Sequence, residues 1–398
     1  MKKKFKVNNV MQNTIKYKVF VLLTATVAFS AGCRKLYNLP DEKQYLSTNA
    51  DYVQKSFQSG LILGRTNILG GGNIFNSDNS TFPITFTITN PRFGDGRDAS
   101  DMLAVKPTLV WTGEYTGKET SLAQIEAKRH LENHPMLETR GNGDIVLWYT
   151  ANKNNIKPAD SIVYPQDQRF FDVKITNSGG SRTIRNLSIT PSIDQPYYPT
   201  ADYNIITGKP NTTTPGGHTL VYNYPDALSG IRGETTNQFM TDPHNQNTGL
   251  VYLYIRKFTD KPGDPTNTAA VGHRLRIKVL DKDSVAIDPT KWNTTKWQDQ
   301  IHGFKKDGTP GGDVYHDYVE YNVAYPIPLA KIPTKFTAGG VANLTGGDMA
   351  QINLTYSRVG YGAVTEVGRI TQNFQIWETG DWEIVFHFKT VNPKFEND

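Results

Sequence analysis

Cys33 is the only cysteine in this 398-residue chain, and its setting indicates a specific modification. It follows a lysine-containing start, an apolar run over residues 19–29 and three small residues at 30–32. A cationic start, an apolar run too short to cross a bilayer and small residues before a cleavage site are typical of a secretory signal peptide. A bacterial lipoprotein has its acylated cysteine at this place, although Ser30 stands where leucine is usual. We predict a signal peptide over residues 1–32 and lipidation of Cys33; the alternative is an ordinary signal peptide or membrane anchor.

Three aspartates, Asp95, Asp98 and Asp101, lie close enough in sequence to be candidate ligands of a calcium ion. Their spacing is not that of an EF-hand loop, so a solvated acidic loop is the expected structure. The chain has no His-Glu-x-x-His zinc motif, and its eight histidines are scattered. We therefore expect no metal centre and no cofactor.

Three carboxylates near the C-terminal end, Glu378, Asp381 and Glu383, are candidates for acid–base chemistry. Glycoside hydrolysis uses two carboxylates that lie roughly 5–10 Å apart. A β-hairpin brings side chains this close routinely, and no Gly-x-Ser-x-Gly nucleophile motif is present. We therefore expect no enzymatic activity and keep a glycoside hydrolase-like enzyme as the alternative.

Tryptophans offer a different chemistry, because a flat aromatic face can stack on the apolar face of a sugar ring. Trp292 and Trp297 flank a polar Asn-Thr-Thr-Lys segment, so we predict that both are partly exposed. Trp377 is a further candidate, with Glu383 and His387 expected beside it to bind sugar hydroxyls. These five residues are the predicted ligand-binding set.

The elements that must position these residues are mainly strands. Runs rich in threonine, tyrosine and valine alternate with turns containing glycine, proline and asparagine, which is typical of antiparallel sheets. Trp111 and Trp148 fall in such runs and are expected in the core. One helix is predicted, with Ser121 and Gln124 at capping-box spacing, continuing through residues 126–131. The predicted strands cover residues 83–90, 108–112, 144–150, 170–176, 183–190, 218–224, 250–258, 273–280, 319–325, 351–358, 374–377 and 382–389.

The last two of these runs suggest a hairpin. A three-residue loop over residues 378–380, with Gly380 in the left-handed conformation, would pair Ile376 with Trp382. A two-residue loop would turn the apolar residues of the first strand toward the polar face, because a one-residue slip reverses every side chain. We predict the three-residue loop, which points Trp377 away from the core.

A segment over residues 200–217, rich in Pro, Thr, Asn and Gly, is the predicted domain boundary. We therefore predict an all-β fold of two antiparallel β-sandwich domains, with one short helix in the first. The predicted divisions are a signal peptide over 1–32, a lipid-anchored tether over 33–58, an N-terminal domain over 59–205 and a C-terminal domain over 215–398.

Charge excludes one class of partner. The whole chain has 43 basic and 38 acidic side chains, a net charge of +5 at pH 7. Six of the lysines and none of the acidic residues lie in residues 1–32, so the mature chain carries a net charge of −1. No positive field remains to attract nucleic acid. No later apolar run is long enough to cross a membrane as a helix.

Five short stretches carry a resemblance to a known family: Leu39-Pro-Asp-Glu-Lys-Gln-Tyr-Leu-Ser47, Ile62-Leu-Gly-Arg-Thr66, Phe75-Asn-Ser-Asp-Asn-Ser-Thr81, Tyr115-Thr-Gly-Lys-Glu119 and Trp377-Glu-Thr-Gly-Asp-Trp382. They resemble the Bacteroidota lipoproteins grouped as domain of unknown function 5007. The resemblance implies an outer-membrane lipoprotein whose relatives tend to be encoded near outer-membrane glycan-uptake transporters, and it implies no catalytic residues. We expect the lipoprotein to face the cell surface, and a periplasm-facing orientation is the alternative.

These observations lead to one functional hypothesis and two rivals. The hypothesis is a non-catalytic lipoprotein, anchored in the outer membrane, that binds a glycan or a glycan-transporter partner. The rivals are a glycoside hydrolase-like enzyme and a structural adhesin. Catalysis requires a deep pocket with coupled carboxylates, whereas glycan binding requires a shallow face with exposed aromatic rings.

Overall fold

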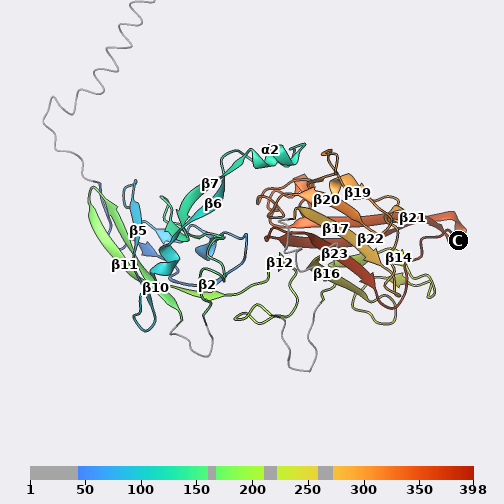
Figure 1. The fold of residues 1–398 in the computed structure, drawn as a ribbon, viewed down its shortest axis with the longest axis horizontal. Coiled ribbons are helices and arrows are strands. Elements are labelled where there is room, and N and C mark those ends of the chain that lie inside the picture. The colour runs from blue at the N-terminus through green and yellow to red at the C-terminus, as the bar shows by residue number, and fades with distance from the viewer. Residues whose placement is uncertain (1–43, 160–166, 210–221, 259–271) are drawn as a thin grey trace, which may run out of the picture.

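The computed structural model describes residues 44–159, 167–209, 222–258 and 272–398 (Figure 1). Nearly all of its regular structure is β, in several sheets that are mostly antiparallel, with one short α-helix among the described residues. The predicted all-β fold class is confirmed. The predicted signal peptide and Cys33 lie outside the described residues. None of the helices in the described part of the chain has the length and apolar character needed to cross a membrane.

Two bodies lie side by side in Figure 1, and each has its own buried core. We call them the N-terminal lobe, up to residue 196, and the C-terminal lobe, from Tyr197 onward. Tyr197 and Tyr198 already pair with a strand of the C-terminal lobe. The predicted boundary over residues 200–217 stays a prediction, because residues 210–221 are not described.

The N-terminal lobe is organised around a four-stranded sheet in the order β2-β11-β10-β5. Its apolar side chains alternate with polar ones, so one face packs into the core, as for Val173 and Ile175 on β10. A three-stranded sheet, β3-β9-β8, contributes to the same core. The strands are β1 (Asp51–Tyr52), β2 (Ser56–Gly60), β3 (Asn67–Ile68), β4 (Phe75–Asn76), β5 (Thr85–Phe93), β6 (Val105–Trp111), β7 (Arg129–Pro135), β8 (Leu137–Thr139), β9 (Ile145–Leu147), β10 (Arg169–Asn177) and β11 (Gly180–Ser192).

The C-terminal lobe is a two-layer sandwich. One sheet has the order β16-β23-β17-β20-β18, with β19 beside β20, and the other has the order β12-β22-β13, with β21 beside β22. Inward side chains of both sheets, such as Phe386 and Phe374, meet in one buried cluster. The strands are β12 (Tyr197–Tyr198), β13 (Ala227–Ser229), β14 (Ile231–Arg232), β15 (Phe239–Met240), β16 (Val251–Lys257), β17 (Arg274–Leu280), β18 (Gly303–Phe304), β19 (Asp313–Val314), β20 (Val319–Val323), β21 (Ala350–Gly360), β22 (Val364–Ile376) and β23 (Trp382–Phe388).

The predicted terminal hairpin is wrong. β23 does not pair with β22; it pairs antiparallel with β16 and parallel with β17, while β22 pairs with β21 in the opposite layer. Ile384 therefore faces Ile255 and Ile277 on its two neighbours. The segment between β22 and β23 crosses from one layer to the other, and Gly380 is not among the glycines with positive φ. The central position buries all seven residues of β23, which a terminal hairpin does not achieve.

The predicted helix is shorter than expected. α2 (Leu122–Glu126) begins at Ser121, whose side chain accepts a hydrogen bond from the Gln124 amide at 3.3 Å. The Gln124 side chain bonds the Thr120 amide, one residue before the cap. The helix ends at Glu126, because residues 129–135 form β7 and pair with all seven residues of β6. A long-range ladder thus replaces the helix predicted over residues 126–131.

β6, α2 and β7 together form an extension, which we call the arm (residues 105–135). It leaves the N-terminal lobe and places α2 against the C-terminal lobe (Figure 1). Ile125 of the helix is fully buried in a third cluster, with Phe304 and Leu329 of the C-terminal lobe. The guanidinium of Arg129 donates to the Tyr325 carbonyl of the same lobe. The arm therefore ties the two lobes together.

The lobes also meet at Trp377. The Arg65 guanidinium lies 4.7 Å from the centre of the Trp377 ring, and the Trp377 amide donates to the Pro196 carbonyl at 2.9 Å. Gly64 sits against the same residue: a Cβ on Gly64 would lie 2.0 Å from the Trp377 carbonyl oxygen. Glycine is required there by contact as well as by its φ of +83°.

Gly64→Ala and Gly71→Ala test this contact. Both positions have positive φ, so alanine is strained at each by about 1–2 kcal/mol. Gly71 has no atom within 4 Å of the added Cβ, whereas Gly64 meets the Trp377 carbonyl. We expect Gly64→Ala to lower the free energy of unfolding by about 1–3 kcal/mol more than Gly71→Ala, as in overpacked sites. Equal losses in urea titrations would contradict the contact between the lobes.

Candidate ligand-binding site

The outer face of the β16-β23-β17-β20-β18 sheet is the strongest candidate site. On β16 the residues Val251, Leu253 and Ile255 point into the core, because side chains alternate along a strand. Tyr252 and Tyr254 therefore point outward, where they are partly exposed.

Two more tyrosines lie on the same face. Asn223 forms an antiparallel bridge with Leu253, with hydrogen bonds of 2.8 and 2.7 Å between their backbones. This bridge sets Tyr222 and Tyr224 across from β16, on the side of Tyr252 and Tyr254. We call these four residues the tyrosine cluster.

The rings of the tyrosine cluster form one continuous aromatic surface. Tyr222 stacks on Tyr252 with ring centres 3.6 Å apart and planes 15° apart, and Tyr254 meets Tyr252 edge to face at 6.3 Å. The Tyr224 ring lies 3.9 Å from that of His244. A hydrogen bond with Tyr222 and burial raise the pKa of Tyr252 to about 12. Burial also raises the pKa of Tyr254 and Tyr224, so these phenols stay protonated and can donate hydrogen bonds at neutral pH.

Glu383 and His387 lie on this outer face but are largely covered. Glu383 is 5% exposed and lies between two cations, 2.7 Å from Arg256 and 3.6 Å from Lys278. The His387 ring nitrogen Nε2 lies 3.2 Å from the Ser284 hydroxyl. Burial lowers the pKa of His387, so the ring is neutral at pH 7.

Trp377 is not beside these residues, which corrects the prediction. It ends the β22 layer and lies under Arg65 of the N-terminal lobe. The predicted facing depended on a hairpin between β22 and β23, and those strands lie in different sheets. Trp377, Glu383 and His387 therefore do not form one site.

Trp292 and Trp297 do not form an exposed pair either. Trp292 is 1% exposed, packed edge to face against Tyr356 and Phe395, so the prediction that it is partly exposed is wrong. Its polar neighbours in sequence face outward and the indole fills the core. Trp297 is partly exposed, as predicted, and its carbonyl accepts a hydrogen bond from the Tyr321 hydroxyl at 2.7 Å.

The candidate calcium ligands point to different partners. Asp95 binds Arg97 at 2.6 Å, Asp98 accepts from Ser100, and Asp101 binds Arg169 at 2.9 Å. In the described ranges, no group of three or more His, Cys, Asp or Glu side chains is arranged to hold a metal ion.

The three candidate catalytic carboxylates are each held by a cation. Glu378 binds Lys257, Asp381 binds Arg274 and Glu383 binds Arg256, all at 2.5–2.7 Å. An ion pair favours the charged form of a carboxylate, whereas a general acid must hold its proton near neutral pH.

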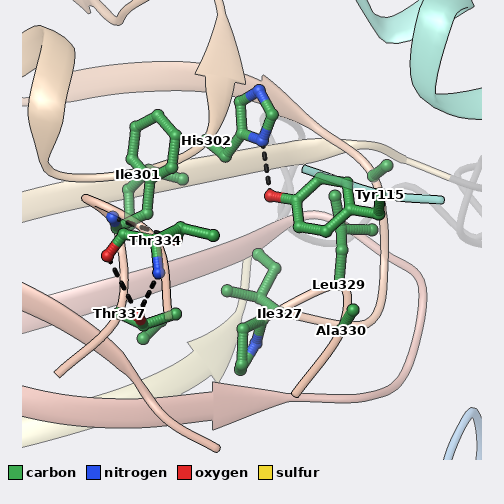
Figure 2. Close-up of a pocket in the computed structure, with 12 residues that line it drawn as sticks. Tyr115, Ile301, His302, Ile327, Leu329, Ala330, Thr334 and Thr337 are labelled. Carbon is green, nitrogen blue, oxygen red and sulfur yellow. Dashed lines mark hydrogen bonds between the residues drawn. The ribbon is translucent and has the colours of Figure 1, made fainter. Parts of the chain in front are cut away.

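A small apolar cavity lies where the arm meets the C-terminal lobe (Figure 2). Tyr115 of the arm closes one side, and His302, Leu329 and Phe336 line the others. Its free volume of about 20 Å³ is enough for a single water molecule. A sugar ring does not fit there, so the cavity belongs to the contact between the lobes.

His302 is the polar centre of this contact. Figure 2 shows the Tyr115 hydroxyl directed at His302 Nδ1, 2.6 Å away. His302 Nε2 lies 2.8 Å from the Glu119 carbonyl, so Nε2 carries the proton and Nδ1 accepts from Tyr115. Burial lowers the pKa of His302. Burial opposes ionisation of Glu119, but hydrogen bonds from Lys128 and Thr116 outweigh it and lower the pKa of Glu119 to about 2.

The family is shown by comparison with known proteins. The model of the domain of unknown function DUF5007 matches residues 75–397. The chain belongs to this family. No curated protein and no solved structure matches it. The matched residues include the arm and the tyrosine cluster, and they begin after β1, β2 and β3 of the N-terminal lobe.

The tyrosine cluster was missed in the sequence, although a signal for it is present. Residues 251–255 read Val-Tyr-Leu-Tyr-Ile, so a buried aliphatic face implies an outward tyrosine face. Tyr-Asn-Tyr at 222–224 repeats the pattern.

Trp111 was expected in the core, and this prediction is wrong. Its side chain is 37% exposed, and its ring lies 5.3 Å from the Arg129 guanidinium.

The stability of the protein should fall on mild acidification because of His302. The pKa of the folded ring lies below its ordinary value near 6.5, so the unfolded chain takes up the proton first as the pH falls. Stability is therefore lost from about pH 7 down to the folded pKa and changes no further below it. His302→Gln, which keeps a donor and an acceptor, should show a shallower loss in urea titrations across this range.

His387 remains in that variant, and its lowered pKa acts in the same direction. His134 opposes it: burial is outweighed by hydrogen bonds to Glu138 and Glu132, so its pKa is raised. The quantity to compare is therefore the slope of the free energy of unfolding against pH, in wild type and in His302→Gln. Equal slopes would contradict the assigned role of His302.

Proposed function

We propose that the protein is a non-catalytic lipoprotein of the Bacteroidota outer membrane, held at the cell surface by acylated Cys33, that binds a glycan on the tyrosine cluster. The observation that carries this proposal is the array of four partly exposed tyrosines on the outer face of a sheet. Sugars are recognised by aromatic faces against their C–H groups and by polar groups at their hydroxyls. The cluster combines aromatic surface with phenolic donors, and Arg256 and Lys389 flank it.

The ion-paired state of Glu378, Asp381 and Glu383 supports binding over hydrolysis. Each of the three carboxylates is held by a cation, which favours its charged form. The general acid of a glycosidase must instead be protonated. A glycoside hydrolase-like enzyme and a structural adhesin remain the alternatives.

A second candidate, binding of an outer-membrane glycan transporter, is favoured by one observation. Val105, Leu109, Trp111 and Leu131 lie on the same face of the β6–β7 ribbon. Leu131 is 64% exposed, and Val105 and Trp111 are also exposed. Exposed apolar surface of this kind is typical of protein interfaces. Co-purification of a transporter with the wild-type lipoprotein from detergent-solubilised membranes tests this candidate.

Cys33→Ala tests the anchor. The variant should fold as wild type but appear in the soluble fraction, because the acyl chains contribute about 0.8 kcal/mol per buried methylene and no other cysteine can carry them. Membrane sedimentation after a high-salt wash measures this. Sedimentation of the variant with outer membranes would refute the lipid anchor.

Tyr252→Ala with Tyr254→Ala tests the glycan site. Both side chains point outward, so we expect binding in affinity electrophoresis to fall at least about tenfold while the melting temperature falls by no more than about 4 °C. Tyr361→Ala is the matched control, because Tyr361 is 92% exposed at the far tip of the β21–β22 hairpin. Equal binding by the double variant and wild type would contradict the site. Absence of binding to any polysaccharide, together with co-purification of a transporter, would favour the partner protein.

A further inference from the structure

Within the described part of the chain, no carboxylate is bonded to the rings of the tyrosine cluster. Neither hydrogen bonds nor electrostatic effects on Tyr224, Tyr252 and Tyr254 involve a carboxylate among the described residues. Burial alone likewise raises the pKa of Tyr197 and Tyr321, whereas five other tyrosines with raised pKa values have a carboxylate acting on them. These tyrosine–carboxylate pairs are Tyr52 with Asp144, Tyr115 with Glu119, Tyr203 with Asp194, Tyr325 with Asp381 and Tyr356 with Glu366.

Cations, by contrast, lie over the cluster. The Lys389 ammonium is 5.8 Å from the centre of the Tyr252 ring, and the Arg256 guanidinium is 5.8 Å from that of Tyr254. No carboxylate of the described residues lies within ion-pair distance of Lys389. Arg256 shares Glu383 with Lys278, so two cations have one largely buried anion between them.

The acidic groups nearest this face lie at its ends and are already engaged. Asp242 binds His244 at 2.9 Å, beyond Tyr224. Asp281 accepts hydrogen bonds from the amides of Asp283 and Val285, in the turn beyond His387. Neither acts on the rings of the cluster. The centre of the face therefore presents positive charge and phenolic donors.

We infer that the ligand of the tyrosine cluster is an anionic glycan, bearing carboxylate or sulfate groups that meet Lys389 and Arg256 while its sugar rings pack on Tyr252 and Tyr254. This inference rests on the proposed glycan-binding function and narrows its ligand. Protonated phenols and the Lys389 ammonium, which has no carboxylate partner among the described residues, suit an anionic ligand. All of them donate hydrogen bonds and none repels negative charge.

The test compares polymers that differ only in charge. Titration calorimetry on the full mature protein in detergent uses polygalacturonate against its methyl ester, and dextran sulfate against dextran. We expect binding to one or both anionic polymers and none to their neutral partners. Raising NaCl from about 50 mM to about 500 mM should weaken it, because the Debye length shortens. Uronate-only or sulfate-only binding identifies which anionic group the site accepts.

Lys389→Gln should lower the association constant at least about fivefold, whereas Lys153→Gln, which removes an exposed lysine of the N-terminal lobe, should not change it. If the neutral polymers bind wild type and this binding is lost in the Tyr252→Ala, Tyr254→Ala variant, the inference is overturned and the proposed function stands. If the anionic polymers bind the Lys389→Gln variant and the Tyr252→Ala, Tyr254→Ala variant as tightly as wild type, they contact the protein elsewhere. That result would overturn the inference. Absence of binding to every polymer would overturn both.

Discussion

The C-terminal lobe depends on the burial of β23 between two other strands. All seven of its residues are buried, with Ile384 and Phe386 in the core between the layers. The strand is central, so the polar side chains on its other face are also buried. They need partners, because an unpaired buried charge is costly. Glu383 pairs with Arg256 and Lys278, so charged side chains lie on the outer face of the sheet.

That outer surface is where an aromatic array can form without weakening the core. β16 contributes aliphatic side chains inward, so its tyrosines are free to carry polar chemistry outward. The short segment around Asn223 extends the sheet edge and brings two more tyrosines alongside. The same strands therefore stabilise the lobe with one face and offer a recognition surface with the other.

The arm gives the two lobes a defined relation. Its helix buries Ile125 against the C-terminal lobe, and its hydrogen bonds to His302 and Tyr325 are directional. Apolar burial supplies the larger part of the free energy of such a contact, and the hydrogen bonds favour one arrangement of the lobes. Trp377 under Arg65 adds a second point of contact, which makes rotation of one lobe on the other costly.

Local pattern was enough to predict the fold class and many of the longer strands. Alternation with a period of two depends on side-chain geometry within each strand, so the runs at 250–258, 273–280 and 382–389 were located closely. The cap at Ser121 was likewise a local matter. The family was also recognisable from short stretches of sequence, and the match over residues 75–397 confirms it.

Tertiary structure decided which strands pair and which faces are covered. β22 and β23 are neighbours in sequence but lie in different layers, because β23 gains more burial between β16 and β17. Trp292 is buried and Trp111 exposed, against expectation, since each depends on what distant segments pack nearby. The tyrosine cluster joins residues 222–224 to β16 for the same reason. Sequence alone determined period and propensity, which are local; partners and exposure were decided by long-range packing.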